Sequence, residues 1–320
     1  MQTILRSDEN SSVLAIEAPA KVNLHLAVKN KRPDGFHDLE SIFMALEFGD
    51  TLYFEQVAAD DHLEITMKGE NLPNFALPTE ENIIFKAVSM FMKRTGYNQG
   101  LRIMVEKRIP IGGGLGGGSS DAVSTLLALN ILASDGKGLL NRASLIEMAA
   151  SLGSDLPFFL SESGAAWVGG LGDVIKPVKA PKNLFFVLVN PGFSSKTAAA
   201  YSLLDESRAG LTYDCTESVK NENDLMNALI GEPRKWPFIN DFLPVFLSQP
   251  ENTANNAGEV YLNILAQLKE LDAEFAGLTG TGSTCFGVFN NRETAEKARK
   301  LLSKTWNNTI LTFPLAFEAK

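Results

Sequence analysis

The 320-residue chain has very few cysteines: only Cys215 and Cys285, which lie far apart in the sequence. Two such cysteines do not form the disulfide framework of a small secreted domain. The first residues, Met1 to Asp8, lack the apolar core of a signal peptide, and no apolar run approaches the roughly 18 residues of a membrane span. We therefore expect a reduced, cytoplasmic protein without an export signal or a membrane span.

Basic residues are also scarce, with 29 Lys and Arg against 38 Asp and Glu, which gives a formal net charge of −9. Nucleic-acid binding needs basic surface to match the phosphate backbone, so we do not expect a nucleic-acid partner. A small anionic ligand would instead need a local device, such as backbone N–H groups and one or two lysines. From bulk composition alone we expect a soluble cytosolic protein of the size of an enzyme.

The length and the 45% content of hydrophobic residues suffice for roughly two domains with full cores. Composition changes to small and glycine-rich residues near 161–170, and we place a domain boundary there. We expect an N-terminal domain over 1–165 and a C-terminal domain over 166–320, in a monomer or weak homodimer. The polar stretch 205–256 has no role that the sequence indicates.

Glycine is concentrated between Gly112 and Gly118, where six of seven residues are glycine. Each glycine loses more backbone entropy on ordering than any other residue, so such a run needs a purpose beyond stability. The usual purpose is a backbone that wraps closely around an anion, with a helix N-terminus behind it. The sequence therefore predicts a phosphate-binding loop here.

The residues on either side predict a strand before the loop and a helix after it. Apolar residues alternate over 101–105, and a helical apolar pattern follows over 122–129, with Ser119 or Ser120 as the expected helix cap. The order is therefore strand, glycine loop, helix.

A P-loop is excluded because its lysine is missing. That motif needs lysine directly after the last glycine, but Ser119 follows Gly118 in the first glycine stretch. The same is true of a second stretch, in which Ser283 follows Gly282. A protein kinase is also excluded, since no His-Arg-Asp or Asp-Phe-Gly triplet follows the glycines.

A dinucleotide-binding oxidoreductase stays open as a minor alternative. Gly112, Gly114 and Gly117 match the spacing of its fingerprint, between a strand and a helix. The ribose-binding acid, however, should follow the next strand. Asp135 is at about the right distance but lies in the loop after the same helix.

Further polar residues are candidates for a site, each with a simpler reading. Lys21 and Asn23 share the polar face of a predicted strand over 13–28, which could equally face water. Asp155 follows the predicted helix 142–152 and precedes an apolar cluster, but it could be an ordinary loop carboxylate.

The spaced motifs together resemble the family of small-molecule kinases named for galactokinase, homoserine kinase, mevalonate kinase and phosphomevalonate kinase, the GHMP kinases. The central motif of that family is similar to Pro110–Gly116 followed by Ser119, Ser120 and Ala122, with two extra glycines before the serines. Four other segments match in order along the chain: Ala18–Leu24, Arg32–His37, Gly153–Phe159 and Leu278–Ser283. The resemblance covers nearly the whole chain and is weakest over 205–256.

The resemblance implies two α+β domains with the active site in the cleft between them. The N-terminal domain would resemble domain 2 of ribosomal protein S5, and the C-terminal domain would be ferredoxin-like. Proteins of this family phosphorylate a hydroxyl with ATP and Mg²⁺. The motif variants are closest to the branch whose substrate carries a cytidine diphosphate and which serves isoprenoid precursor synthesis; a mevalonate-like or homoserine-like substrate is the alternative.

The resemblance also implies roles for individual residues. Lys21 and Asp155 would be the catalytic pair, with Asp155 as the base and Lys21 stabilising charge at the attacking oxygen. ATP would be held by Asn82, Lys107, Pro110, Gly112, Gly113, Gly114, Leu115, Gly116, Gly117, Gly118, Ser119 and Ser120. Ser119 or Ser120 would help to hold Mg²⁺. We expect Asp121 to be a first-turn capping residue that points away from the phosphates.

On the acceptor side, the cytosine would stack between Phe36 and Tyr201, and His37 would read the edge of the base. Asn23 would contact the polyol part, and Thr279 and Gly280 would complete the substrate site. Relatives commonly have tyrosine at position 36, but stacking needs only the ring face, so we expect recognition to survive.

Overall fold

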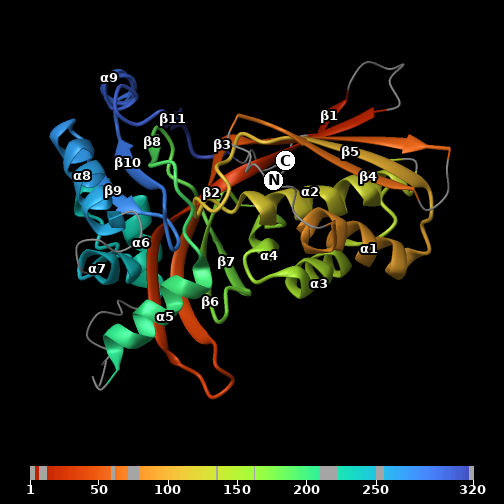
Figure 1. Ribbon diagram of the computed structural model, residues 1–320, viewed down its shortest axis with the longest axis horizontal. Helices are drawn as coiled ribbons and strands as arrows, with labels where there is room; N and C mark the ends of the chain where they lie inside the picture. The colour runs from red at the N-terminus through yellow and green to blue at the C-terminus, as the bar shows by residue number, and fades with distance from the viewer. Residues whose placement is uncertain are drawn as a thin grey trace. The chain divides into compact units, whose positions relative to one another are not determined.

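The computed structural model describes residues 4–6, 13–58, 62–70, 79–134, 136–161, 163–209, 222–249 and 256–316, and every structural statement below concerns these residues (Figure 1). They form two compact units, each assembled from several segments of the chain. The first unit comprises 1–20, 48–111 and 116–162, and the second comprises 21–47, 112–115 and 163–320. The predicted domains, 1–165 and 166–320, are continuous segments, unlike these units, and they stay a prediction.

The first unit contains strands paired mostly in antiparallel fashion. Its strands are β1 (Ile4–Arg6), the start of β2 (Val13–Lys31), the end of β3 (His37–Val57), β4 (Leu63–Lys68) and β5 (Gly100–Glu106). β1 pairs antiparallel with β2, β5 pairs antiparallel with β3, and β4 pairs parallel with β5. Residues of β5 that alternate along the strand are buried, as their spacing predicts.

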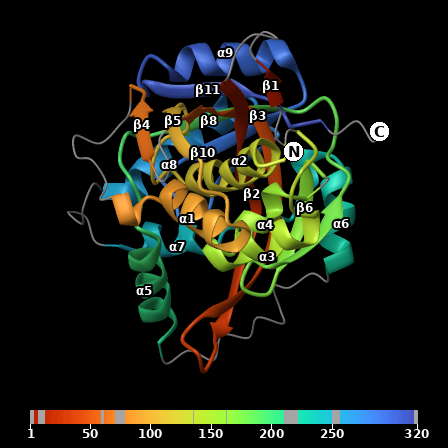
Figure 2. The same ribbon diagram turned by 90° about the vertical axis from the view of Figure 1, so that its right-hand side faces the viewer.

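Four helices of the first unit pack together, as Figure 2 shows. They are α1 (Ile83–Thr95), α2 (Gly117–Leu132), α3 (Arg142–Leu152) and the single-turn α4 (Leu156–Phe159), and a short 3₁₀ turn η1 (Thr79–Glu81) precedes α1. α2 is buried on nearly every side, and its buried residues include polar ones (Ser120, Asp121, Ser124, Thr125 and Asn130) as well as apolar ones.

The second unit has a four-stranded antiparallel sheet in the order β11-β8-β10-β9. These strands are β8 (Phe185–Asn190), β9 (Phe275–Leu278), β10 (Cys285–Phe289) and β11 (Asn308–Thr312). The first part of β3 also pairs antiparallel with β6 (Ala165–Gly169), and β6 pairs antiparallel with β7 (Val174–Val178), so β6 and β7 belong to the same seven-stranded sheet as β3.

Helices of the second unit cover its four-stranded sheet. α8 (Ala257–Glu270) packs on β9 and β10, while α9 (Arg292–Leu302) packs on β8 and β11. The other helical segments are α5 (Thr197–Arg208), α6 (Glu222–Ile230), the turn η2 (Pro233–Lys235) and α7 (Phe242–Leu247). The predicted α+β class is confirmed. None of the described helices is both long and apolar enough to cross a membrane.

Two predicted helix caps are wrong. The apolar periodicity over 79–93 predicts a helix with Thr79 as its cap. α1 instead begins after Asn82, whose side chain accepts a hydrogen bond from the N–H of Ile84 at 2.9 Å, so Asn82 is the cap. α2 begins after Gly116, which adopts a left-handed conformation, so Ser119 and Ser120 lie inside the first turn. In both cases several adjacent residues could cap the helix, and the tertiary position of the chain decided which one does.

The sequence predicts two strands, over 42–48 and 51–57, on either side of Gly49 and Asp50. This break is also wrong, because β3 runs through both residues without interruption. A Cβ at Gly49 would lie 2.3 Å from the carbonyl oxygen of Ala18. Gly49 therefore allows the backbone of β3 to approach the backbone at Ala18 closely, and it does not form a turn.

Replacing Gly49 by alanine should destabilise the protein by about 1–3 kcal/mol, because the backbone of β3 would have to move away from Ala18. Gly118→Ala is the matched control. Its Cβ would make only an ordinary contact, 3.7 Å from the Cγ2 of Ile83, at a helical position where alanine is favoured. Urea unfolding measures both, and equal stability of Gly49→Ala and the wild type would contradict the steric argument.

Candidate active site

The predicted phosphate loop has the backbone that its composition predicts. Gly112, Gly114 and Gly116 have φ angles of 68°, 76° and 70°, in the left-handed region that favours glycine. The loop leads directly into α2, the helix that begins at Gly117. The order of strand, glycine loop and helix is thus confirmed, and N–H groups at the start of a helix are suited to binding an anion.

Within the second unit, the middle of this loop packs against the second glycine-rich motif. A Cβ at Gly114 would lie 2.3 Å from the carbonyl oxygen of Thr279 and 2.8 Å from that of Gly282. The Oγ1 of Thr279 donates to the carbonyl of Gly114 at 3.1 Å, and the N–H of Thr284 donates to the carbonyl of Gly113 at 3.2 Å. The two glycine-rich motifs, 165 residues apart in sequence at this contact, therefore form one structure.

Lys21 and Asn23 of β2 belong to the same cluster. The ammonium of Lys21 donates to the Oδ1 of Asn23 at 2.7 Å and lies 4.2 Å from the centre of the Phe43 ring. The N–H of Asn23 donates to the Oγ1 of Thr279 at 2.9 Å, and the N–H of Lys21 donates to the carbonyl of Leu115 at 2.9 Å. Lys21 and Asn23 are 4% and 3% exposed, so their polar face does not meet bulk water.

These contacts bring together four of the predicted site residues, Lys21, Asn23, Thr279 and Gly280. At Gly280, a Cβ would lie 3.6 Å from the Oδ1 of Asn23 and 3.4 Å from the Cα of Gly114. A buried lysine with fixed hydrogen-bonding neighbours is a strong local positive charge, because little solvent screens it. The cluster can therefore stabilise an anionic group placed beside it.

Asp155 lies in the first unit, at the N-terminal end of α4. Its side chain is partly buried, and the four residues of α4 that follow it are all buried. This matches the predicted half-shielded carboxylate after a helix end, because α3 ends at Leu152 and Gly153 follows as its C-cap.

The first unit contains a buried charge cluster that the sequence did not indicate. The ammonium of Lys107 lies 2.5 Å from the Oδ2 of Asp50 and 2.7 Å from the Oδ2 of Asp121. The Oδ1 of Asp50 also accepts the N–H groups of Arg108 and Ile109, at 2.6 and 2.8 Å. The cluster therefore ties the residues that precede the glycine loop to the helix that follows it.

One expectation is corrected by this cluster. Asp121 is not a first-turn capping residue, because it lies beyond the first turn of α2, is 2% exposed and pairs with Lys107. The ammonium of Lys107 is engaged by two carboxylates, and its place beside adenosine stays a prediction. No local sequence pattern could have identified Asp50 as a partner of Lys107, 57 residues away.

The cluster shifts the pKa of two of its members. Burial raises the pKa of Asp121 to about 7, the attraction of Lys107 opposes this rise, and repulsion from Asp50 adds to it. Burial acts to lower the pKa of Lys107, but the two carboxylates outweigh it, so that pKa lies above its usual value. Lys107 therefore stays charged, while Asp121 exchanges a proton near neutral pH.

The hydroxyl groups that follow the glycines differ in exposure. Ser119 is partly buried, whereas Ser120 is fully buried and its Oγ has no hydrogen-bond partner within the described residues. Mg²⁺ in nucleotide sites prefers oxygen ligands and keeps phosphates and waters around it, so a serine hydroxyl fits its chemistry. No group of three or more His, Cys, Asp or Glu side chains among the described residues could hold a metal ion by itself.

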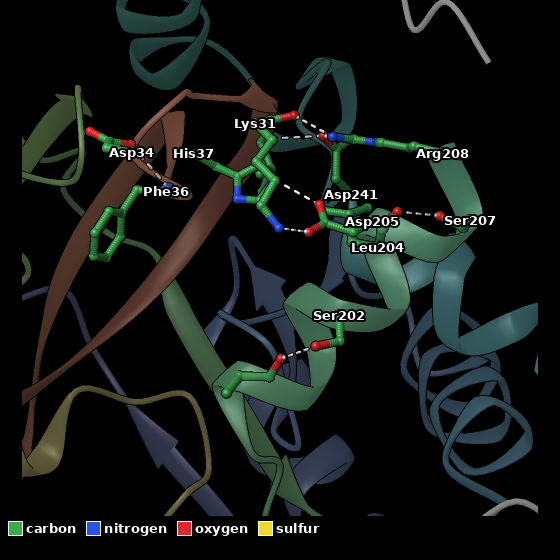
Figure 3. A network of polar contacts seen from close by, with 12 residues as sticks. Lys31, Asp34, Phe36, His37, Ser202, Leu204, Asp205, Ser207, Arg208 and Asp241 are labelled. Carbon is green, nitrogen blue, oxygen red and sulfur yellow. Dashed lines mark hydrogen bonds and ion pairs between the residues drawn. The ribbon is translucent and has the colours of Figure 1, made fainter. Parts of the chain in front are cut away.

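The three residues predicted to bind a base, Phe36, His37 and Tyr201, lie in the second unit, and Figure 3 shows the first two. The rings of His37 and Tyr201 are 5.3 Å apart and tilted by 36°, so the structure brings these two together. Phe36 is 63% exposed, and its ring points away from the His37 ring in Figure 3. The Nε2 of His37 is 2.8 Å from the Oδ1 of Asp205, a residue that the sequence analysis did not single out.

Removing the positive charge of the buried cluster should lower the free energy of unfolding far more than removing an exposed positive charge. Lys107→Met leaves Asp50 and Asp121 buried without their cation, and we expect a loss of about 3–5 kcal/mol in the free energy of unfolding. Arg102→Met is the control, because Arg102 pairs with Glu55 and Glu64 at the surface, where solvent screens the charges, and should contribute little to stability. Similar urea midpoints for the two variants would contradict this account.

The raised pKa of Asp121 predicts a pH dependence of stability. Between about pH 4, where an unfolded aspartate titrates, and about pH 7, the folded protein keeps a proton that the unfolded chain has released. The contribution of Asp121 to stability therefore falls as the pH rises through this window, by on the order of 1 kcal/mol per pH unit. Asp121→Asn removes this titration. Urea unfolding from pH 4.5 to 7.5 should show the wild type losing stability relative to the variant, and parallel curves would refute the assignment.

Two family models match the chain. The model for the N-terminal domain of GHMP kinases matches residues 82–163, and the model for the C-terminal domain of GHMP kinases matches residues 245–308. The first match contains the glycine loop and Asp155, and the second contains the second glycine-rich motif. The family that the motifs suggested is thus found independently.

Curated relatives match nearly from end to end. The 4-diphosphocytidyl-2-C-methyl-D-erythritol kinase of Thermodesulfovibrio yellowstonii is 36% identical over 302 residues, covering 94% of this chain and 98% of the relative. The protein of the same name from Syntrophus aciditrophicus is 35% identical over 307 residues, covering 92% and 97%.

Solved structures agree. A crystal structure of 4-(cytidine 5'-diphospho)-2C-methyl-D-erythritol kinase matches with a TM-score of 0.72 and 28% identity, over 94% of this chain and all of that one. The homoserine kinase of Cytophaga hutchinsonii has a TM-score of 0.67 at 16% identity, covering 97% of each chain, and shares the fold. With relatives more than 30% identical over nearly their full length, the chain belongs to the GHMP kinase family, in the group of the 4-diphosphocytidyl-2-C-methyl-D-erythritol kinases.

Proposed function

We propose that the protein uses ATP to phosphorylate the 2-hydroxyl of 4-diphosphocytidyl-2-C-methyl-D-erythritol, giving the 2-phosphate and ADP, in the non-mevalonate route to isoprenoid precursors. The observation that carries the proposal is the cluster of Lys21, Asn23 and Thr279 packed against the glycine loop, in a chain that matches kinases of this name over nearly its full length. A buried cation beside a phosphate-type loop is what phosphoryl transfer requires.

In the proposed reaction, Asp155 accepts the proton of the substrate hydroxyl as the oxygen attacks the γ-phosphorus of ATP. A new oxygen–phosphorus bond forms, the bond between the γ-phosphorus and the bridging oxygen breaks, and ADP leaves. Lys21 stabilises the negative charge that develops at the attacking oxygen, and its burial makes that interaction stronger than it would be in water. Asn23 holds Lys21 in place and contacts the polyol.

The donor nucleotide would lie along the glycine loop, with N–H groups of Gly112–Gly118 and the start of α2 directed at its phosphates. Asn82 would line the adenosine pocket. Of the two serines, the accessible Ser119 is better placed than the buried Ser120 to reach a bound Mg²⁺. That ion, when bound with the nucleotide, would neutralise charge on the phosphates.

At the acceptor end, Phe36 and Tyr201 would stack on the cytosine and His37 would read its edge, while Thr279 and Gly280 line the polyol. The exposed ring of Phe36 supports this role, because a large apolar side chain that is 63% exposed gains from covering a ligand. The proximity of His37 and Tyr201 is a second support.

ATP turnover with a panel of acceptors tests the proposal. We expect phosphorylation of 4-diphosphocytidyl-2-C-methyl-D-erythritol and none of mevalonate or homoserine. Asp155→Asn should reduce kcat by roughly 10²–10⁴ because the proton acceptor is lost. Glu147→Gln, at an exposed carboxylate of α3, is the control and should leave kcat unchanged. The assignment would be overturned if the protein phosphorylated mevalonate or homoserine but not 4-diphosphocytidyl-2-C-methyl-D-erythritol. A kcat near that of the wild type in Asp155→Asn would also overturn it.

A further inference from the structure

One helix face holds the ring of His37 on two sides. Tyr201 and Asp205 are four residues apart in α5, so their side chains lie on the same face of the helix, one turn from each other. Tyr201 contacts the His37 ring at a centroid distance of 5.3 Å. Asp205 contacts the edge of the same ring at Nε2, 2.8 Å away, as Figure 3 shows. The His37 side chain is only 6% exposed, so the ring cannot turn over without breaking these contacts.

The charge on Asp205 decides the direction of its hydrogen bond with His37. Its Oδ2 also accepts from the ammonium of Lys31, at 2.5 Å. Partial burial acts to raise the pKa of Asp205, but the hydrogen bonds from Lys31 and His37 outweigh it and lower that pKa. An ionised carboxylate only accepts, so the Nε2 of His37 must be the donor. In the neutral ring, Nδ1 is then left as an acceptor.

The position of Asp205 is fixed from the end of its helix. Arg208, three residues further along α5, donates to the carbonyl of Val28 at 2.7 Å and to the Oδ2 of Asp241 at 2.8 Å. The same Oδ2 accepts the N–H of Val28, also at 2.8 Å. α5 is thereby attached to β2, the strand whose last residue is Lys31. The helix, Lys31 and His37 form one connected polar network, drawn in Figure 3.

We propose that Asp205 is a positioning residue for base selection: by holding His37 in the Nε2–H tautomer, it makes Nδ1 an acceptor that favours cytosine over uracil. Cytosine presents an amino donor at the position where uracil, like thymine, presents a carbonyl acceptor. An Nδ1 lone pair therefore pairs with the first base and repels the second. This inference rests on the proposed function for placing a pyrimidine at His37.

The experiment compares three variants with the wild type. Asp205→Ala removes the acceptor at a helical position where alanine is tolerated. Glu206→Ala is the matched control, since it removes an equal charge from the next residue of α5, which is exposed. Lys31→Met removes the other partner of Asp205. The lysine of that ion pair is 54% exposed, so the pair should contribute little to holding Asp205 in place.

Two measurements are made on each protein. One is the ratio of dissociation constants for uridine 5'-diphosphate and cytidine 5'-diphosphate, with the donor site saturated by a non-hydrolysable ATP analogue. The other is the tautomer of His37 from ¹⁵N NMR of the ring nitrogens, at a pH where the imidazole is neutral. The first reports selection and the second reports the cause that we assign to it.

The wild type, Glu206→Ala and Lys31→Met should show the Nε2–H tautomer and prefer the cytidine nucleotide. In Asp205→Ala, the tautomers should mix and the preference should fall roughly tenfold or more, the size expected when one discriminating hydrogen bond is lost. Affinity for the ATP analogue should not change. Since α5 is attached through Arg208 rather than Asp205, we expect the variant to fold.

An unchanged tautomer in Asp205→Ala would overturn the inference, as would a changed tautomer with an unchanged preference, or an equal loss in Glu206→Ala. The proposed function fails separately. The reaction would be refuted if the wild type did not phosphorylate the cytidine-linked substrate. If Asp205→Ala nevertheless lost the preference for the cytidine nucleotide, the role of Asp205 would stand. Normal turnover by the wild type, together with an unaltered nucleotide preference in Asp205→Ala, would support the reaction and refute the role of Asp205.

Discussion

The contact between the two glycine-rich motifs is the constraint on which the rest of the site depends. At Gly114 the backbones approach so closely that a Cβ would lie 2.3 Å from the carbonyl oxygen of Thr279. The hydroxyl of Thr279 bridges this contact to Asn23, and Asn23 in turn accepts from Lys21. The position of the buried cation is therefore set by a backbone approach, and each polar group in the chain from loop to lysine has a partner that fixes it.

Local sequence patterns were sufficient to predict elements whose burial follows a simple period. The strand over 101–105 and the helix ending before Gly153 were predicted because their apolar spacing and end signals are local properties. Gly49 misled, because glycine permits both a turn and a close approach, and only the position of Ala18 distinguishes them. Such a distinction depends on a residue 31 positions earlier, so no window along the chain contains it.

The site itself was predictable to the extent that motifs carried it. Lys21, Asn23 and Thr279 were singled out from sequence, and the structure brings them together. The partners of charged groups were not predictable: Lys107 is paired with Asp50 and Asp121, and His37 with Asp205, over separations of 57, 14 and 168 residues. The only local signal for Asp205 was its spacing of one helical turn from Tyr201, which marks a shared face but not what that face contacts.

The glycines of the phosphate loop can be divided by what requires them. At Gly114 the protein itself leaves no room for a side chain, so any larger residue is opposed by the fold. At Gly118 an added Cβ would meet only the Cγ2 of Ile83, at an ordinary 3.7 Å, and the backbone there is helical. The folded chain alone would accept alanine at this position. A requirement for glycine at Gly118 would therefore have to come from something that approaches the backbone from outside the protein, and substitutions at this one position would separate the demands of binding from those of folding.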